Sequence, residues 1–187
     1  METLAVPRNL LTTHPETLDV QPRQQRLLIG VPKELTLQED RVALVPHSVA
    51  TLTAHGHRVL VESTAGQASR FTDLEYAEAG AEIVHSHELV FKADVLLKVA
   101  PPTLQEIALM QPNQVLISPI QLPVLESEYI AHLQKKRVIA LAMEYIRDDG
   151  GIFPFVRVMS EIAGISAILI AADLLATARG GDRKSVV

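Results

Sequence analysis

The sequence has no cysteine and no tryptophan among its 187 residues, and aromatic side chains make up only 4% of it. Without cysteine, a disulfide scaffold, a thiolate metal site and a cysteine nucleophile are all excluded. With so few aromatic rings, the core must be largely aliphatic. Basic residues are also in the minority, with 17 Lys and Arg against 22 Asp and Glu, so we expect no nucleic-acid partner.

Hydrophobic residues make up 48% of the chain and charged residues 21%, which is typical of a globular protein of one ordinary domain or slightly more. The apolar core of the segment Ser160–Thr177 runs only from Ile162 to Ala172, which is shorter than the roughly 20 residues that cross a bilayer. We therefore expect no membrane span. Residues 1–26 lack the basic start and unbroken apolar run of a secretory signal, and we expect a mobile leader there.

From Leu27 onward, short apolar segments alternate with helical ones. Strands are expected at Leu27–Val31, Arg58–Glu62, Ile83–Val84, Asp94–Val99, Val115–Ile120 and Val138–Tyr145. Helices are expected at His47–His55, Asp73–Ala79 and Val124–Lys136. Strands that are apolar on both faces and alternate with helices predict an α/β fold, with a mostly parallel sheet of about six strands flanked by helices.

The last apolar segment predicts one long helix, buried between two domains. Ser160 is suited to cap its start, Glu161 to complement its dipole, and helix starts also bind phosphates through free N–H groups. The expected organisation is a substrate-side domain at 27–157 and an interdomain helix at 158–178. After it, residues 179–187 do not end as an α/β domain normally does, and we expect a truncated or non-native tail.

Two basic residues, Arg41 and Lys98, are candidates for binding a substrate. Arg41 follows a Gln-Glu-Asp turn, and its guanidinium can hold a carboxylate with two parallel hydrogen bonds; the alternative is a surface salt bridge. Lys98 ends the strand Asp94–Val99, and ligands of α/β sheets gather at the carboxyl ends of strands. Its ammonium can stabilise the charge that develops on a keto oxygen; the alternative is an edge lysine that reaches water.

Histidine pairs raise the question of a metal site. His55 and His57 flank Gly56, and His85 and His87 flank Ser86, but no carboxylate cluster accompanies either pair in the sequence. Zinc needs three or four ligands, so we expect no metal and interpret these residues as solvated turn histidines. A G-x-G-x-x-G dinucleotide fingerprint between a strand and a helix is also absent from the sequence.

Five segments together carry a family resemblance. The strings Ile29–Glu34 (IGVPKE), Gln38–Pro46 (QEDRVALVP), His55–Glu62, Ala93–Val99 and Met159–Gly164 (MSEIAG) resemble the N-terminal, substrate-side part of the alanine dehydrogenase and NAD(P) transhydrogenase alpha-subunit family. The resemblance extends from about Leu28 to Ala176, and it implies a Rossmann-like or flavodoxin-like fold for this part.

The resemblance implies roles for three residues. Arg41 matches the family residue that binds the substrate carboxylate, Lys98 a catalytic residue that contacts the substrate, and Ser160 a residue that contacts the dinucleotide. It also implies NAD as cofactor, bound mainly by a domain absent from this chain, so we expect no hydride transfer by the chain alone. A small keto or amino acid is the expected substrate, in a cytoplasmic protein that forms a homo-oligomer when full length.

Gln121 is where the chain departs from the alanine dehydrogenases, which carry an acid-base histidine at the matching catalytic position. Glutamine holds a hydrogen bond but exchanges no proton near neutral pH, and His132 falls on the following helix. An alanine dehydrogenase-like enzyme is favoured by the segment Ala142–Ile146, and a transhydrogenase alpha subunit by Gln121. The resemblance also leaves open a saccharopine dehydrogenase-like enzyme and a non-catalytic scaffold.

Overall fold

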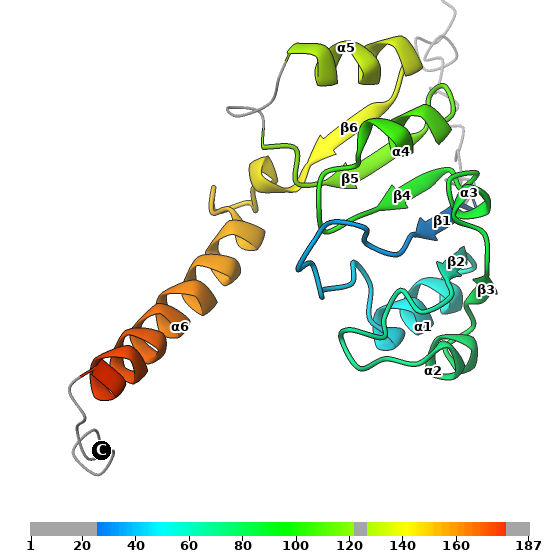
Figure 1. The fold of residues 1–187 in the computed structure, drawn as a ribbon. Coiled ribbons are helices and arrows are strands. Elements are labelled where there is room, and N and C mark those ends of the chain that lie inside the picture. Colours follow the sequence, from blue (N-terminus) through cyan, green and yellow to red (C-terminus); the bar gives the residue numbers. More distant parts are fainter. Residues whose placement is uncertain (1–25, 122–126, 179–187) are drawn as a thin grey trace, which may run out of the picture.

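The computed structural model describes residues 26–121 and 127–178. Within these residues, helices pack on a sheet, and one long helix projects away from it (Figure 1). The expected tail at 179–187 and all but the last residue of the expected leader lie outside the described residues.

Six parallel strands form a single sheet, as the sequence predicts. They are β1 (Leu28–Val31), β2 (Arg58–Glu62), β3 (Glu82–Val84), β4 (Val95–Leu97), β5 (Val115–Ser118) and β6 (Ile139–Ala142). The expected strand Val138–Tyr145 is shorter, because the chain turns after β6 into the 3-10 helix η3 (Met143–Tyr145).

The order of the strands is β3-β2-β1-β4-β5-β6. The sheet grows from β1 to β3 in one direction, and the chain then crosses back to place β4 on the other side of β1 (Figure 1). Such a reversal opens a crevice at the carboxyl ends of the two central strands, where α/β proteins bind ligands. Here the segment Pro32–Glu34 leaves β1 and Lys98 leaves β4 at that place.

Short helices fill the connections between the strands. They are α1 (Pro46–Ala54), α2 (Asp73–Glu78), α3 (His87–Val90), α4 (Leu104–Leu109) and α5 (Ser127–Lys136). The sequence reasoning missed α3 and α4. Both α2 and α4 begin with a capping box, in which Thr72 and Thr103 exchange hydrogen bonds with Glu75 and Glu106.

Two apolar clusters cover the two faces of the sheet, because successive side chains of a strand point to opposite faces. One holds Ile29, Val31, Val49, Val59, Val61, Ala65 and Tyr76. The other holds Val90, Phe91, Ala93, Leu96, Ile107, Met110, Leu116, Ile120 and Leu133. The core is largely aliphatic, as expected, but Tyr76 and Phe91 are fully buried within it.

The long helix α6 runs from Pro154 to Ala178 and begins six residues before the expected start at Ser160. Proline is favoured at the first position of a helix, where its missing N–H has no partner to lose. Glu161 therefore lies inside the helix, where it pairs with Arg157 at 2.9 Å instead of facing the free N–H groups of the first turn.

The apolar side chains of α6 are exposed rather than buried among the described residues, and Ile168 is 71% exposed. The helix contacts the sheet domain near η3 and then extends away from it (Figure 1). By length and composition alone, Pro154–Leu175 is long and apolar enough to cross a membrane. The helix expected from the sequence was shorter than this because its start was placed at Ser160 instead of Pro154. A single helix of this kind is weak support for a membrane span, because the core helices of proteins without one can have the same length and composition.

Candidate active site

Lys98 is the first residue after β4, and its side chain is only 1% exposed. Its backbone N–H donates to the carbonyl of Ile117 in β5 at 3.0 Å, so the lysine leaves the sheet in a fixed direction. Its Nζ donates to Glu34 Oε2 and to Glu106 Oε1, each at 2.8 Å. The alternative of an edge lysine that reaches water is therefore wrong: this ammonium is buried between two carboxylates.

Both carboxylates are themselves held by backbone N–H groups. Glu34 Oε1 accepts the N–H of Val99 at 2.6 Å, and Glu106 Oε2 accepts the N–H of Thr103 at 2.7 Å. Each glutamate thus uses one oxygen for the backbone and the other for Lys98. Sequence reasoning missed both partners, although Glu34 lies in the quoted IGVPKE string and Glu106 completes a T-x-x-E capping box.

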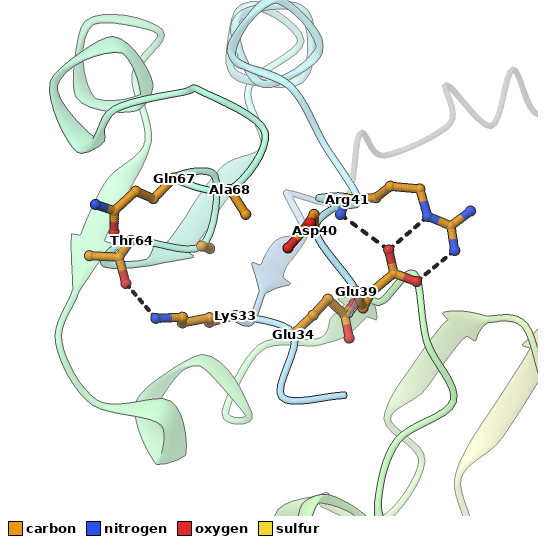
Figure 2. Close-up of a pocket in the computed structure, with 9 residues that line it drawn as sticks. Lys33, Glu34, Glu39, Asp40, Arg41, Thr64, Gln67 and Ala68 are labelled. Atoms are coloured by element: carbon orange, nitrogen blue, oxygen red, sulfur yellow. Dashed lines mark hydrogen bonds and ion pairs between the residues drawn. The ribbon is translucent and has the colours of Figure 1, made fainter. Parts of the chain in front are cut away.

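Arg41 lies in the loop between β1 and α1, with 52% of its side chain exposed. Its guanidinium donates two parallel hydrogen bonds to Glu39, from Nε to Oε1 at 2.7 Å and from Nη2 to Oε2 at 2.6 Å (Figure 2). This pairing lowers the pKa of the Glu39 carboxyl and raises the pKa of Arg41. The guanidinium therefore has the two-pronged geometry expected for binding a carboxylate, and Glu39 supplies that carboxylate.

The loop that carries Arg41 is tied to the domain at two points. The hydroxyl of the buried Tyr76 donates to the carbonyl of Leu44 at 2.7 Å, and the hydroxyl of Ser69 donates to the carbonyl of Asp40 at 2.6 Å. Burial raises the pKa of Tyr76 to about 12, so its hydroxyl keeps its proton at neutral pH. In addition, Arg41 Nη1 donates to Met159 Sδ in α6 at 3.4 Å.

A hollow of about 250 Å³ opens beside Arg41 (Figure 2). Its walls come from the segments that follow β1 and β2: Lys33, Glu34, Glu39, Asp40, Arg41, Thr64, Ala65, Gln67 and Ala68. Lys33 Nζ donates to Thr64 Oγ1 at 3.0 Å and so connects the two segments. Drug-sized ligands need pockets of at least about 300 Å³, so this hollow suits a molecule of few atoms.

Glu34 links the two cations that the sequence singles out. It lines the hollow together with Arg41, and it accepts the hydrogen bond from the buried Lys98. The pKa of Arg41 is raised chiefly by its hydrogen bond to Glu39, and the charge of Glu34 adds to this effect. Glu34 therefore interacts with both cations: it accepts a hydrogen bond from Lys98, and its negative charge favours the charged form of Arg41.

Most of the chain matches a known protein family. The family profile described as "Alanine dehydrogenase/PNT, N-terminal domain" matches residues 30–163, which is more than half of the chain. The chain belongs to this family.

Its relatives include the alanine dehydrogenase of Bacillus subtilis (strain 168), which is 39% identical over 83% of this chain and 40% of its own length. That of Staphylococcus saprophyticus is 34% identical over 83% of this chain and 42% of its own length. The chain therefore spans less than half of the curated relatives that it matches.

Among solved structures, an L-alanine dehydrogenase superposes with a TM-score of 0.78 at 35% identity, over 83% of this chain and 43% of its own. A transhydrogenase from Sinorhizobium meliloti superposes with a TM-score of 0.60 at 34% identity, over 64% of this chain and 35% of its own. Both the family and the α/β fold expected from the sequence are thus confirmed. The similar proteins include a transhydrogenase as well as alanine dehydrogenases.

Gln121, which the sequence resemblance matches to the acid-base histidine of alanine dehydrogenases, lies in the turn after β5. Its backbone has a positive φ of 55°, and its side chain is exposed. The backbone N–H groups of Ile120 and Gln121 both donate to Glu144 Oε1, at 3.0 and 2.6 Å. Glu144 thus fixes the turn. Within residues 26–121 and 127–178, the Gln121 side chain makes no hydrogen bond to Arg41 or Lys98, and Gln121 does not line the hollow.

Ser160, the residue matched to the dinucleotide contact of the family, does not start a helix. It lies inside α6, six residues after Pro154, and its side chain is exposed. The expected capping role of Ser160, and a phosphate site built on free N–H groups at that point, are therefore wrong, because an interior residue has its N–H engaged in the helix.

His87 is not a solvated turn residue, contrary to the sequence interpretation. It is the first residue of α3, and its ring Nδ1 lies 2.7 Å from Glu62 Oε2. Its Nε2 lies 3.5 Å from Glu106 Oε1, which connects it to the surroundings of Lys98. The described residues contain no group of three or more His, Cys, Asp or Glu side chains arranged to hold a metal ion.

Proposed function

We propose that the chain is the substrate-side part of an NAD-dependent amino-acid dehydrogenase that converts L-alanine, NAD and water to pyruvate, ammonia and NADH, and the reverse. Membership of the family and the identity to alanine dehydrogenases support this proposal. The observation that carries it is the buried ammonium of Lys98 at the carboxyl end of β4, connected through Glu34 to a small hollow that Arg41 lines.

Arg41 is proposed to bind the carboxylate of the substrate. In the structure its guanidinium holds Glu39, a carboxylate only two residues away in the chain, and about half of the side chain faces solvent. A substrate carboxylate takes the place of Glu39 with the same two parallel hydrogen bonds.

Lys98 is proposed to act on the keto oxygen. An ammonium has three N–H donors, and Glu34 and Glu106 occupy two of them. The remaining donor, or the one released when Glu34 moves, binds the oxygen of pyruvate and stabilises the negative charge that grows on it as the carbonyl is reduced. Burial strengthens this effect because little water screens the charge.

The cofactor NAD supplies the hydride acceptor of this reaction. Ser160 is interior to α6, and the sequence has no G-x-G-x-x-G fingerprint. We therefore propose that NAD is bound mainly outside these residues, that 158–178 joins the substrate-side domain 27–157 to the part that binds it, and that this chain alone transfers no hydride.

The alpha subunit of a proton-translocating transhydrogenase is the second candidate. Gln121 favours it, since a glutamine cannot exchange a proton near neutral pH and this candidate reduces no carbon substrate, and the Sinorhizobium meliloti transhydrogenase shares the fold. For the amino-acid dehydrogenase, we propose that the partner is a small molecule rather than a nucleic acid and that the full-length protein is a cytoplasmic homo-oligomer.

A chimaeric enzyme tests the proposal. Residues 30–163 replace the matching segment of the Bacillus subtilis alanine dehydrogenase, and NADH formation from L-alanine is measured. We expect the chimaera to form NADH slowly. The variant Gln121→His should form NADH faster because it restores an acid-base group, and Lys98→Met should form none. Lys92→Met, which alters an exposed lysine, is the matched control and should change nothing.

Two results contradict the proposal. A folded chimaera that binds NAD but forms no NADH, even with Gln121→His, favours the transhydrogenase candidate. NADH formation by the 187-residue chain alone refutes its expected inactivity.

A further inference from the structure

A chain of charged side chains continues from Lys98 into the domain. Glu106 Oε1, which accepts the Lys98 hydrogen bond at 2.8 Å, also lies 3.5 Å from His87 Nε2. On the other side of the imidazole, His87 Nδ1 lies 2.7 Å from Glu62 Oε2. Lys98 directly follows β4, and Glu106, His87 and Glu62 lie in α4, α3 and β2, so the fold rather than local sequence brings the four groups together.

Both oxygens that face the imidazole are already acceptors. Glu62 Oε2 accepts the backbone N–H of Lys33 at 2.8 Å, and Glu106 Oε1 accepts from Lys98. A neutral imidazole has a single N–H, so one of its nitrogens would turn a lone pair toward a carboxylate oxygen. His87 Nε2 is buried and has no hydrogen-bond partner among the described residues. Only the imidazolium offers an N–H to each carboxylate.

The charge balance points the same way. Glu34 and Glu106 contact the Lys98 ammonium, Glu62 and Glu106 face the His87 ring, and the side chains of Glu34 and Glu106 are only 4% and 3% exposed. This cluster therefore holds three carboxylates and one ammonium. A proton on His87 reduces this excess of negative charge where burial makes it costly. The ring of Phe91 lies 4.9 Å from that of His87, centroid to centroid, and limits its movement.

We propose that His87 is a positioning residue for Lys98 that acts through Glu106. The imidazolium and the ammonium share Glu106 Oε1, so protonation of His87 draws this oxygen toward the imidazole and loosens its bond to Lys98. Lys98 then has a donor free for a ligand, and the site takes up an anionic 2-oxo acid more tightly at lower pH. The choice of ligand rests on the proposed function; the coupling between His87 and Lys98 does not.

The groups around His87 are few enough to assign such a titration. From β2 it faces Glu62, from α4 Glu106, and through Glu106 it reaches Lys98. On its own helix, Glu88 is exposed, and the preceding His85 is exposed as well. On β3, the neighbouring Glu82 is paired with Arg58 at 2.7 Å. His85→Gln is therefore a matched control for His87→Gln.

The first test is NMR of the unmodified chain between about pH 5 and about pH 8, the range in which histidine titrates. We expect the His87 ring to carry two N–H groups at the acidic end and one at the basic end. The Lys98 ammonium resonance should move with the same midpoint, and in His87→Gln it should stay still. A His87 ring that remains in one neutral tautomer throughout, or a Lys98 resonance that ignores the His87 midpoint, overturns the proposal.

The second test measures pyruvate binding by calorimetry at about pH 6 and about pH 8. The unmodified chain and His85→Gln should bind on the order of threefold to tenfold more tightly at the lower pH, as one extra nearby positive charge predicts, and His87→Gln should lose this dependence. An unchanged dependence in His87→Gln overturns the proposal. If pyruvate binds none of the three proteins while His87 and Lys98 still titrate together, the proposed substrate is refuted and the coupling stands.

Discussion

Lys98 and Arg41 carry the same charge, and Glu34, which lines the hollow beside Arg41, also accepts a hydrogen bond from Lys98, yet the two cations differ in burial and in partners. Lys98 is 1% exposed and is held by carboxylates from two distant segments, whereas Arg41 is 52% exposed and is held by Glu39, two residues away. A buried cation with two partners is part of the architecture, because none of the three groups can be removed alone. An exposed cation with a local partner is free to exchange that partner for a ligand.

Removing the buried cation should have the largest effect. Lys98→Met leaves Glu34 and Glu106 buried without their cation, and we expect a loss of about 3–5 kcal/mol in the free energy of unfolding, as found when one partner of a buried pair is removed. Urea denaturation measures this loss. The triple variant Lys98→Met, Glu34→Gln, Glu106→Gln should recover part of the lost stability. If Lys98→Met alone is as stable as the unmodified chain, the buried cation does not stabilise the fold more than the exposed one does.

The packing of β1 against the segment that follows β3 should be almost as intolerant of substitution. Gly30 in β1 faces α3 so closely that an added Cβ would lie 2.7 Å from the carbonyl oxygen of Val90 and 2.9 Å from the Cβ of Ala93. We expect Gly30→Ala to lower the free energy of unfolding by about 1–3 kcal/mol through overpacking. Gly164→Ala, in the open middle of α6, is the control and should not destabilise. Equal effects of the two changes would show that β1 and α3 separate easily.

The sheet could be predicted from the sequence because its strands are short apolar runs with clear ends. Arg58–Glu62 forms β2 with the limits that the sequence gives it, bounded by the glycine turn before it. Lys98 could be placed for the same reason, since it ends such a run. Helices α3 and α4 have only 4 and 6 residues, too few to show an amphipathic pattern, and their formation depends on caps and on packing against the sheet.

The parts that could not be predicted depend on contacts between distant segments. Glu34 lies 64 residues from Lys98, and His87 lies 25 from Glu62. No local pattern distinguishes such a histidine from one exposed in a turn. The start of α6 was misplaced because Ser160 and Glu161 resemble a helix start, while the proline that begins it, Pro154, was not used.

The exposed cation should matter little to stability and much to binding. Because the Arg41 side chain is 52% exposed, although that of its partner Glu39 is only 13% exposed, Arg41→Gln should change the free energy of unfolding by no more than about 1 kcal/mol. It should nevertheless weaken pyruvate binding by about tenfold or more, since two charge-assisted hydrogen bonds are lost. Arg41→Lys keeps the charge and should recover only part of the affinity. A large loss of stability in Arg41→Gln would place Arg41 in the same class as Lys98.

The smallest expected effect is the pH dependence of the Arg41–Glu39 pair. The hydrogen bond from Arg41 lowers the pKa of Glu39 below its ordinary value of 4.5, so the folded chain releases this proton more readily than the unfolded chain. The pair therefore stabilises the fold fully above pH 4.5 and loses its contribution as the pH falls through the lower pKa of the folded state. In urea denaturation, the difference in stability between the unmodified chain and Glu39→Gln should shrink over that acidic range.

The same difference should also shrink in high salt, because screening weakens exposed pairs much more than buried ones. If the difference in stability between the unmodified chain and Glu39→Gln stays the same at acidic pH or does not change with salt, Glu39 acts through packing rather than through its charge. Arg41 would then be held in place as firmly as Lys98, and its guanidinium would not be free to exchange Glu39 for a substrate carboxylate.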